Sequence, residues 1–290
     1  MSNTPVVNSF HHAASGTWTH VVADPATRKA AIVDPVLDFD AASGRIDARP
    51  ARELLARVGE LGLTVEAILE THAHADHLSA GAWLHERTGA PLAIGAGIVE
   101  VQHTFKRLLA LDDGFVADGS QFDRLLRDGD VVRIGELDVR VIATPGHTPD
   151  SQSYLVADAL FVGDTLFAPA AGTARCDFPG GDAAMLFRSI QRLYGLPDAT
   201  RVFLCHDYPA SDSEAIAQSS ISDEKRGNAQ LRADTGERAY VDIRQRRDAN
   251  LPVPKLLWPA IQFNIRGGRL PAREANGGAF FKLPVTLDAS

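Results

Sequence analysis

The chain has 290 residues, which is enough for one large domain or two modest ones, and 45% of them are hydrophobic, so it should bury a sizeable core. A balance of 29 basic against 37 acidic residues gives a formal net charge of −8, which disfavours nucleic acid or an anionic membrane as the main partner. With no apolar run long enough to span a bilayer, no pattern typical of a secretory signal and only two cysteines, the sequence favours a cytoplasmic protein without a disulfide framework.

Strands come first in the predicted order, and helices then alternate with them. Apolar runs and helical periodicity predict strands at residues 17–23 and 29–33, a helix at 50–61, a strand at 65–69, a helix at about 80–88, a strand near 92–94 and a helix near 98–109. Residues 111–130, rich in Asp and Gly, are predicted to form a long loop.

The second half begins with four further predicted strands, at residues 131–134, 137–143, 153–156 and 160–162. A helix is predicted at residues 182–194, with Asp182 as its N-cap and Gly195 as its stop. Residues 201–205 are predicted to form the last core strand. Two mixed sheets that face each other, with helices outside, would fit this alternation.

Residues 211–290 have a different character. They are polar and predicted to be helical to about Arg247, and prolines then punctuate the chain to its end. We therefore expect an α+β protein with a catalytic domain at residues 1–210. The remaining residues 211–290 are expected to be a mostly helical extension packed on the same domain.

A cluster of metal-ligating residue types follows the predicted strand 65–69: His72, His74, Asp76 and His77. His72 and His74 are two positions apart just beyond a strand, so their side chains should point the same way. Three imidazoles packed together are unfavourable when protonated, and a divalent cation resolves this because neutral imidazole and carboxylate are common metal ligands. The cluster therefore predicts a metal site; the alternative is a polar helix N-terminus that is rich in His by chance.

Three later residues could complete such a site. His147 lies on a Pro-Gly turn after a predicted strand, and Asp164 and His206 each follow a strand as well. Singly, each is more often an ordinary turn residue. Together they repeat one arrangement, a ligand-type residue just past the C-terminal end of an apolar strand, which is where open α/β architectures place their sites.

The segments H-A-H-A-D-H, P-G-H-T-P, G-D-T and C-H-D-Y resemble those of the metallo-β-lactamase superfamily over residues 1 to about 210. This resemblance implies a four-layer αββα sandwich with a metal pocket at one edge of the two sheets. It leaves two reactions open.

The first reaction is that of the dinuclear hydrolases, such as glyoxalase II. The resemblance then implies two metals per chain, divided among the donors as follows: His72, His74 and His147 on one metal, Asp76, His77 and His206 on the other, and Asp164 between them. A bridging hydroxide would attack the carbonyl carbon of a thioester.

The second reaction is that of the persulfide dioxygenases, which use one iron. The resemblance implies that His72, His147 and Asp164 bind one Fe(2+) per chain, although zinc or manganese suits the same ligands. Two imidazoles and a carboxylate leave coordination positions open for a persulfide and O₂. The other donors would orient the ligands and hold water: His74, Asp76, His77 and His206.

Residues 172–178 favour the dioxygenase reading. Arg175, Asp177 and Phe178 resemble the Arg-x-Asp-Phe segment of persulfide dioxygenases, in which the Arg helps to bind the glutathione carboxylate. By this resemblance Arg175, Asp177 and Tyr208 are expected to bind substrate. Cys176, beside Arg175, could have a lowered thiol pKa and relay sulfur, or it could be a loop residue with no role.

The resulting expectation is a persulfide dioxygenase that oxidises glutathione persulfide, or a related low-molecular-weight persulfide, with O₂ to sulfite. The alternative is a dinuclear metallohydrolase of thioesters. Ala174 and Cys176 stand where the family more often has Gly and Thr, which leaves the identity of the thiol carrier open. The resemblance is also compatible with a homodimer.

Overall fold

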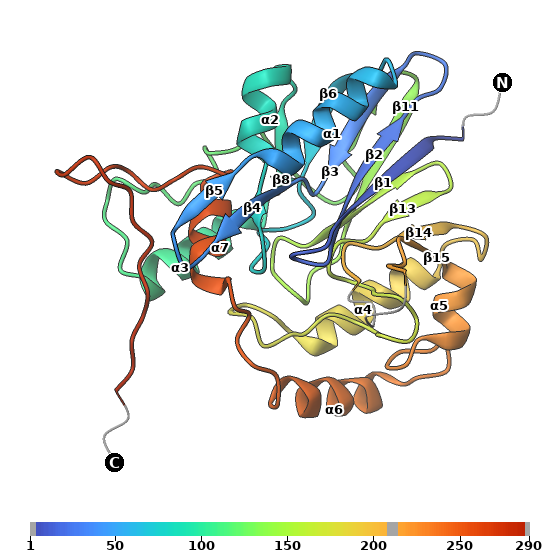
Figure 1. Ribbon diagram of the computed structural model, residues 1–290. Helices are drawn as coiled ribbons and strands as arrows, with labels where there is room; N and C mark the ends of the chain where they lie inside the picture. Colours follow the sequence, from blue (N-terminus) through green and yellow to red (C-terminus); the bar gives the residue numbers. More distant parts are fainter. Residues whose placement is uncertain (1–3, 208–213, 288–290) are drawn as a thin grey trace.

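Two six-stranded sheets face each other at the centre of the computed structural model, which describes residues 4–207 and 214–287 (Figure 1). The first sheet has the strand order β1 (Val6–His12), β2 (Thr17–Ala23), β3 (Lys29–Val33), β6 (Thr64–Leu69), β8 (Leu92–Gly95) and β9 (Arg124–Leu126). Its first three strands are antiparallel, and β3, β6, β8 and β9 run parallel to one another.

The second sheet has the order β10 (Val131–Ile134), β11 (Leu137–Ala143), β12 (Gln152–Val156), β13 (Ala159–Phe161), β14 (Arg201–Phe203) and β15 (Gln218–Ser220). It is antiparallel except between β13 and β14. A small third sheet joins β5 (Arg45–Asp47), β4 (Val36–Asp40) and β7 (Leu78–Ser79).

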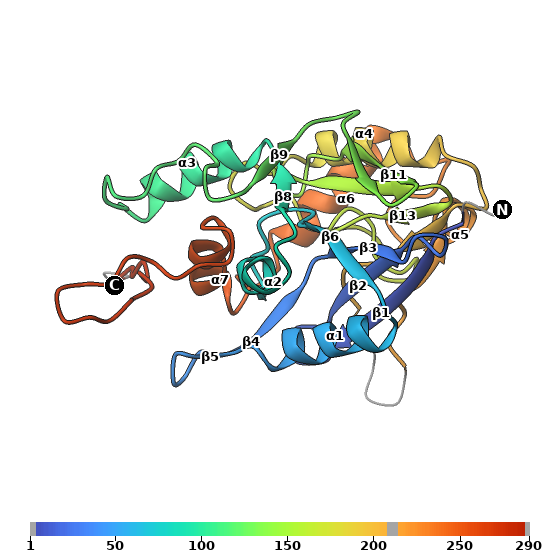
Figure 2. The same cartoon turned by 90° about the horizontal axis from the view of Figure 1, so that it is seen from above.

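Helices cover both outer faces of the sheets, as the views in Figures 1 and 2 agree. On the first sheet pack α1 (Arg49–Glu60), α2 (Gly81–Thr88) and α3 (Ile98–Leu108). On the second pack α4 (Ala183–Tyr194), α5 (Ile221–Gly227) and α6 (Glu237–Asp248). The expected four-layer α+β sandwich is confirmed. In the ranges that the structure describes, no helix is long and apolar enough to cross a membrane.

The alternation of side chains along each strand separates the core into layers. In β3, Ala30 and Ile32 point toward the helices of the first sheet, whereas Ala31 and Val33 point between the two sheets. This follows from the two-residue period of a strand. Because both faces are covered, β3 is apolar from Ala30 to Val33 rather than alternating in polarity.

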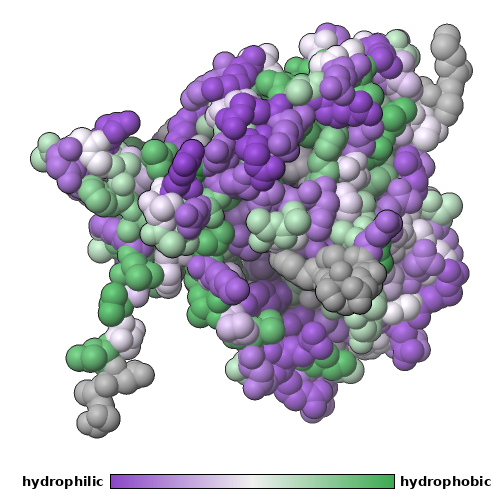
Figure 3. All heavy atoms as spheres, viewed as in Figure 1, coloured by the Kyte–Doolittle hydropathy of each residue, from purple (hydrophilic) through white to green (hydrophobic). Residues whose placement is uncertain are grey.

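The C-terminal extension contacts both outer layers. Helix α6 packs against α4, with the ring of Tyr240 5.9 Å from that of Phe187. Helix α7 (Leu257–Asn264) instead lies beside β7 and buries Ile261 and Phe263 in the core of the first sheet. The chain then leaves the body as an arm whose exposed apolar side chains are visible in Figure 3, with Val285 85% exposed.

Several elements differ from those predicted. The predicted strands at residues 17–23 and 29–33 are confirmed, but β1, β4, β5, β7, β15 and α7 were not predicted. The predicted loop 111–130 is interrupted by β9. Helix α7 accommodates Pro259 because this residue lies in the first turn, where a backbone N–H has no partner within the helix.

Candidate metal centre

The seven donors predicted from the sequence lie in loops at one edge of the sandwich, after β6, β11, β13 and β14. Their ligand atoms form two main groups, in each of which all atoms lie within 4.8 Å of one another. The first group is His72, His147 and Asp164, and the second is His74, Asp76, His77 and His206. The structure thus brings together all seven residues.

In the first group, two imidazoles face one carboxylate oxygen. The Nε2 atoms of His72 and His147 lie 3.9 and 3.7 Å from Oδ2 of Asp164. His147 Nδ1 donates to the carbonyl oxygen of Arg175 at 2.7 Å, and His72 Nδ1 lies 3.0 Å from the Thr71 hydroxyl oxygen. With both Nδ1 atoms protonated, both Nε2 lone pairs point to the centre.

Asp164 also faces the second group. Its other oxygen, Oδ1, lies 3.3 Å from His206 Nε2, which is 3.3 Å from Asp76 Oδ2 as well. His77 Nδ1 lies 3.3 Å from Asp76 Oδ1. Asp164 therefore stands between the two groups, with one oxygen directed to each.

His74 is held from behind by a buried carboxylate that was not among the predicted site residues. Its Nε2 lies 3.0 Å from Oδ1 of Asp34, which also accepts a hydrogen bond from Thr71 N at 2.7 Å. Asp34 has a φ of 50°, a left-handed conformation that is uncommon outside glycine. Its only signal in the sequence is its place directly after the apolar strand β3.

Other polar groups fasten the loop between β6 and α2. Asp150 accepts a hydrogen bond from Ala73 N at 2.8 Å. From α7, Asn264 donates to the carbonyl oxygens of His74 and His77, both at 2.8 Å. The sequence gives little sign of such contacts, because each joins segments that are far apart along the chain.

Glycine is required before His147. Gly146 has a φ of 138°, and a Cβ atom there would lie 2.3 Å from the backbone nitrogen of Leu186 in α4. A side chain at this position would push the turn off α4 and move His147. The Pro-Gly-His turn therefore places its imidazole by packing closely on a helix.

Burial and the neighbouring charges together set the charge of the site. Burial alone would lower the pKa of His206, but Asp164 and Asp76 raise it above its usual value. Burial lowers the pKa of His72 and of His74 well below the usual value, and neighbouring imidazoles add to the effect. Burial raises the pKa of Asp164. Burial alone would raise the pKa of Asp76, but His206 and His77 lower it well below its usual value. Neutral imidazoles beside a carboxylate are a donor set suited to a metal ion.

The donors fit a metal by a second criterion. Within the described part of the chain, buried ring nitrogens of the donor histidines have no hydrogen-bond partner, among them His72 Nε2, His74 Nδ1 and His77 Nε2. Buried polar atoms without partners are rare and call for an explanation such as an ion. Imidazole and carboxylate donors suit zinc, iron and manganese alike, so the geometry indicates a metal site without identifying the metal.

Two of the three predicted substrate residues, Arg175 and Asp177, bond to each other. The guanidinium of Arg175 donates to both oxygens of Asp177 at 2.6 Å, and to the carbonyl oxygen of Pro252 at 2.8 Å. A substrate carboxylate at Arg175 would therefore have to compete with Asp177. Tyr208, the third predicted substrate residue, lies outside the described residues.

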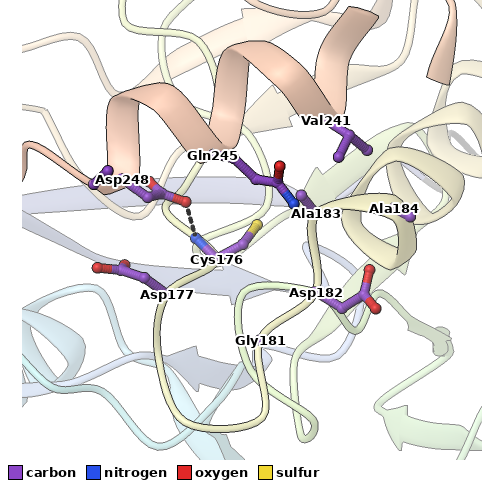
Figure 4. A pocket seen from close by; sticks show the side chains of 10 residues that line it. Cys176, Asp177, Gly181, Asp182, Ala183, Ala184, Val241, Gln245 and Asp248 are labelled. Carbon is purple, nitrogen blue, oxygen red and sulfur yellow. Dashed lines mark hydrogen bonds between the residues drawn. The ribbon is translucent and has the colours of Figure 1, made fainter. Parts of the chain in front are cut away.

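Cys176 is buried beside a pocket of about 480 Å³ between α4 and α6 (Figure 4). Its backbone nitrogen donates to Asp248 Oδ2 at 2.9 Å. Burial raises the pKa of its thiol to about 12, which contradicts the lowered pKa that the sulfur-relay alternative requires. The physical reason is that the charge of Arg175 is engaged by Asp177, while apolar packing around the thiol disfavours the thiolate.

Comparison with known proteins gives one family match. The profile described as the Metallo-beta-lactamase superfamily matches residues 14–206. The chain is 45% identical over 289 residues to a probable metallo-hydrolase of Burkholderia pseudomallei, covering 96% of this chain and 98% of that protein. It is also 45% identical to a beta-lactamase hydrolase-like protein of Xylella fastidiosa. That match covers 97% of this chain and 65% of the Xylella protein.

Two further similar proteins both carry the name ETHE1. The chain is 28% identical over 271 residues to the mitochondrial persulfide dioxygenase ETHE1 of Homo sapiens, covering 92% of this chain and 91% of that protein. Its structure is similar to the crystal structure of ETHE1 from Myxococcus xanthus, with a TM-score of 0.73 and 34% identity, covering 91% of this chain and all of that one.

Proposed function

Because the chain belongs to the metallo-β-lactamase superfamily, we propose that it acts as a persulfide dioxygenase on glutathione persulfide or a related low-molecular-weight persulfide. The observation that carries this proposal is the group His72, His147 and Asp164, whose ligand atoms lie within 4.8 Å of one another. Two imidazoles and one carboxylate on one face are typical of non-haem iron oxygenases. Similarity to ETHE1 proteins supports the same reaction.

The proposed cofactor is one Fe(2+) per chain, held by His72, His147 and Asp164. When bound, it would supply open coordination positions and the redox capacity that a reaction with O₂ requires. Zinc or manganese could occupy the same ligands in protein as isolated, because their ligand preferences overlap.

The proposed reaction consumes one persulfide, one O₂ and one water, and yields one thiol, one sulfite dianion and two protons. The terminal sulfur is oxidised by four electrons, and O₂ accepts all four. The products include protons that must leave a buried site. His77 and His206, with Asp76 between them, are placed to hold water and to accept such protons.

Around this group, the chain itself supplies orientation. The backbone carbonyl of Arg175 fixes the ring of His147, and Phe178 lies against that ring at 6.0 Å between centroids. We propose that the carboxylate of the thiol carrier replaces Asp177 as the partner of the Arg175 guanidinium. Bidentate pairing suits either carboxylate. The segment would then connect carrier binding to the position of His147.

A dinuclear hydrolase of thioesters is the second candidate. The observation in its favour is Asp164, which directs one oxygen to each group of donors, as a bridging ligand would. The relatives from Burkholderia and Xylella that are named as hydrolases or hydrolase-like favour it too. In this case His74, Asp76, His77 and His206 would be ligands rather than residues that hold water.

Metal content and oxygen uptake together decide between the two. Protein purified without oxygen should contain about one iron per chain and should consume O₂ when given glutathione persulfide. His147→Ala should abolish uptake, whereas His103→Ala, an exposed imidazole on α3, should leave it unchanged. Two zinc ions per chain with turnover of lactoylglutathione, and no oxygen uptake by iron-loaded protein, would establish the hydrolase instead.

A further inference from the structure

The turn between β1 and β2 carries polar side chains that connect the metal-site imidazoles to the surface. The hydroxyl oxygen of Thr17 lies 3.3 Å from Nδ1 of His77 and 3.3 Å from Nδ1 of His206. That oxygen lies 2.7 Å from the Ser15 hydroxyl oxygen, which is 2.7 Å from His12 Nδ1. These contacts form one unbroken chain of hydrogen bonds.

The chain ends on a carboxylate at the surface. His12 Nε2 lies 2.8 Å from Asp38 Oδ1, and the other oxygen of Asp38 pairs with Arg49 at 2.9 Å. Thr17 is fully buried, whereas the side chain of Asp38 is 25% exposed. The connection therefore runs from the interior of the site to solvent.

With His12 neutral, one direction of donation satisfies every member of this chain. Asp38 paired with Arg49 accepts, so His12 Nε2 carries a proton and His12 Nδ1 accepts from Ser15. Ser15 then accepts from Thr17, whose own hydroxyl oxygen must accept from the imidazoles. Donation thus runs outward, and the imidazoles of His77 and His206 must present N–H groups at Nδ1.

We propose that His12, Ser15 and Thr17 are positioning residues that fix His77 and His206 as Nδ1–H tautomers, with their Nε2 atoms directed to the metal side of the site. A hydrogen-bonded partner on the far nitrogen orients a ligand imidazole and strengthens its donor atom. This role is the same whether the reaction is oxidation or hydrolysis, because both need these two rings to face a metal or its water.

Backbone contacts make the turn a fixed part of the site. Thr17 and His206 form an isolated antiparallel bridge, and Trp18 N donates to the carbonyl oxygen of Cys205 at 2.7 Å. Asp207 N donates to the carbonyl oxygen of Gly16 at 2.9 Å. The turn and the loop after β14 therefore move together, which keeps the Thr17 hydroxyl opposite His206.

The same hairpin offers a matched control. On β1, the Ser9 hydroxyl oxygen lies 2.9 Å from Nδ1 of the buried His20, whose Nε2 donates to the carbonyl oxygen of Leu204. This is also a serine bonded to an imidazole, but His20 is not one of the seven donors. Ser9→Ala therefore removes a bond of the same kind without touching the proposed chain.

Side-chain nitrogen spectra of the zinc-loaded protein test the tautomers without a substrate. In wild type, we expect His77 and His206 to show protonated Nδ1 atoms whose protons exchange slowly with water. Thr17→Val should shift the tautomer of His77, and Ser15→Ala should speed exchange of both protons about tenfold or more. Ser9→Ala should leave both signals unchanged.

Zinc affinity, measured by competition with a chelator, gives the second readout. For zinc held by the second group of donors, to which His77 and His206 belong, Thr17→Val should weaken binding about 10- to 100-fold. Ser15→Ala should weaken it less. His12→Ala should resemble Ser15→Ala. His12→Gln should restore most of the loss, because a carboxamide oxygen can accept from Ser15 while its NH₂ group donates to Asp38.

The proposal is overturned if Ser15→Ala, like the control Ser9→Ala, gives the imidazole signals and the zinc affinity of wild type. Ser15 lies at a half-buried turn, so its variant decides the matter even where Thr17→Val does not fold. Neither measurement involves persulfide, thioester or O₂, so failure here is distinct from failure of the proposed reaction.

Discussion

The buried carboxylate of Asp34 contacts two residues of the loop between β6 and α2, Thr71 and His74. Its two oxygens accept from Thr71 N at 2.7 Å and from the Thr71 hydroxyl at 2.9 Å, and Oδ1 lies 3.0 Å from His74 Nε2. Desolvation raises the pKa of this carboxyl group, while its bonds to Thr71 oppose the rise. Its place beneath His74 makes it the residue through which β3 supports the site.

Asp34→Asn should therefore weaken zinc binding about 10- to 100-fold, measured by chelator competition. The carboxamide of Asn has nearly the same volume as the carboxylate. Its NH₂ group, however, would face a hydrogen-bond donor of Thr71 or His74 in place of an acceptor oxygen. The matched control is Asp24→Asn, at the other end of the first sheet, where the carboxylate accepts from Thr27 and Glu136. That variant should lower the unfolding free energy only; equal zinc loss in both variants would contradict a specific role for Asp34.

Asp150 gives the metal-free protein a pH dependence that can be measured. Burial raises its pKa from 3.8 to about 6, so the folded state binds this proton more tightly than the unfolded state. The resulting stability is complete below the unfolded pKa and is lost as the pH rises through about 6. A rise of this size corresponds to roughly 3 kcal/mol.

Asp150→Asn stays neutral, and its amide oxygen can still accept from Ala73 N. We expect the unfolding free energy of wild type, relative to that of this variant, to fall by roughly 3 kcal/mol between about pH 4 and pH 7. Urea unfolding of the metal-free proteins at matched pH measures the difference. A difference that does not change with pH would show that burial does not perturb this carboxyl group.

Cys176 should be unreactive in the folded protein. Burial raises the pKa of its thiol to about 12, and burial raises that of Cys205 well above the usual value, so neither forms much thiolate near neutral pH. Iodoacetamide at about pH 8 should label neither residue quickly, whereas denatured protein should take up two labels, counted by mass spectrometry. Rapid labelling of native Cys176 would revive a role in sulfur transfer.

At the residue scale, the sequence predicts the metal donors. It does not predict the residues that hold those donors in place. His72, His74, Asp76 and His77 form a dense local pattern whose residue types suggest the chemistry. Asp34 and Asn264 carry no such pattern, because their partners lie 37 to 40 and 185 to 190 positions away. Contacts of this kind depend on the tertiary fold and leave no periodic trace in the sequence.

At the scale of elements, α7 joins the C-terminal extension to the metal-site loop through one side chain. Asn264 accepts from Ser79 N at 2.9 Å and donates to the carbonyl oxygens of His74 and His77. Asn264→Ala would leave these buried backbone groups unpaired. We expect a loss of roughly 2–4 kcal/mol in unfolding free energy and weaker zinc binding, measured by urea unfolding and chelator competition.

Gln262 provides the control on the same helix. Its side chain also makes three hydrogen bonds, to the carbonyl oxygens of Trp258 and Lys282 and from Lys282 N, but none reaches the loop. Gln262→Ala should reduce stability without changing zinc affinity. If both variants bind zinc like wild type, α7 supports the fold and does not position the loop.

Secondary structure was predictable where the pattern of apolar residues is strong. Strands β2 and β3 have the predicted bounds, and α4 begins after its predicted N-cap Asp182, whose side chain accepts from Met185 N. Strand β1 was missed because it lies at an edge, where its mixed polar residues are only partly buried. Strands of two or three residues, such as β7 and β15, are too short for a periodic signal.

At the scale of the whole molecule, the site is assembled from segments far apart in the chain. The donors follow the C-terminal ends of four strands that meet at the same edge: β6 in the first sheet, and β11, β13 and β14 in the second. Local sequence patterns predict where each of these strands ends, but not that the ends lie together. The order of strands in each sheet was not predicted, because strand pairing is a long-range property.

We propose that residues 211–290 belong to the same folding unit as the catalytic residues. Tyr240 of α6 and Ile261 of α7 are fully buried in different core clusters, on opposite outer faces of the sandwich. An extension that fills two separate cores, and also fastens the loop of His74, differs from a domain joined by a linker. The exposed arm beyond Lys282, in contrast, carries apolar residues with little burial.

Two truncations separate these parts. Ending the chain after Lys282 keeps α7 and the bonds between Gln262 and Lys282, so thermal unfolding should stay a single transition with zinc affinity like that of the full chain. Ending it after Ala249 removes α7, exposes the apolar surface beneath Ile261 and releases the loop. This shorter chain should unfold at a lower temperature and bind zinc at least about tenfold more weakly. Equal affinity in both would mean that α7 is dispensable for the site, and the extension would then be an accessory to the domain.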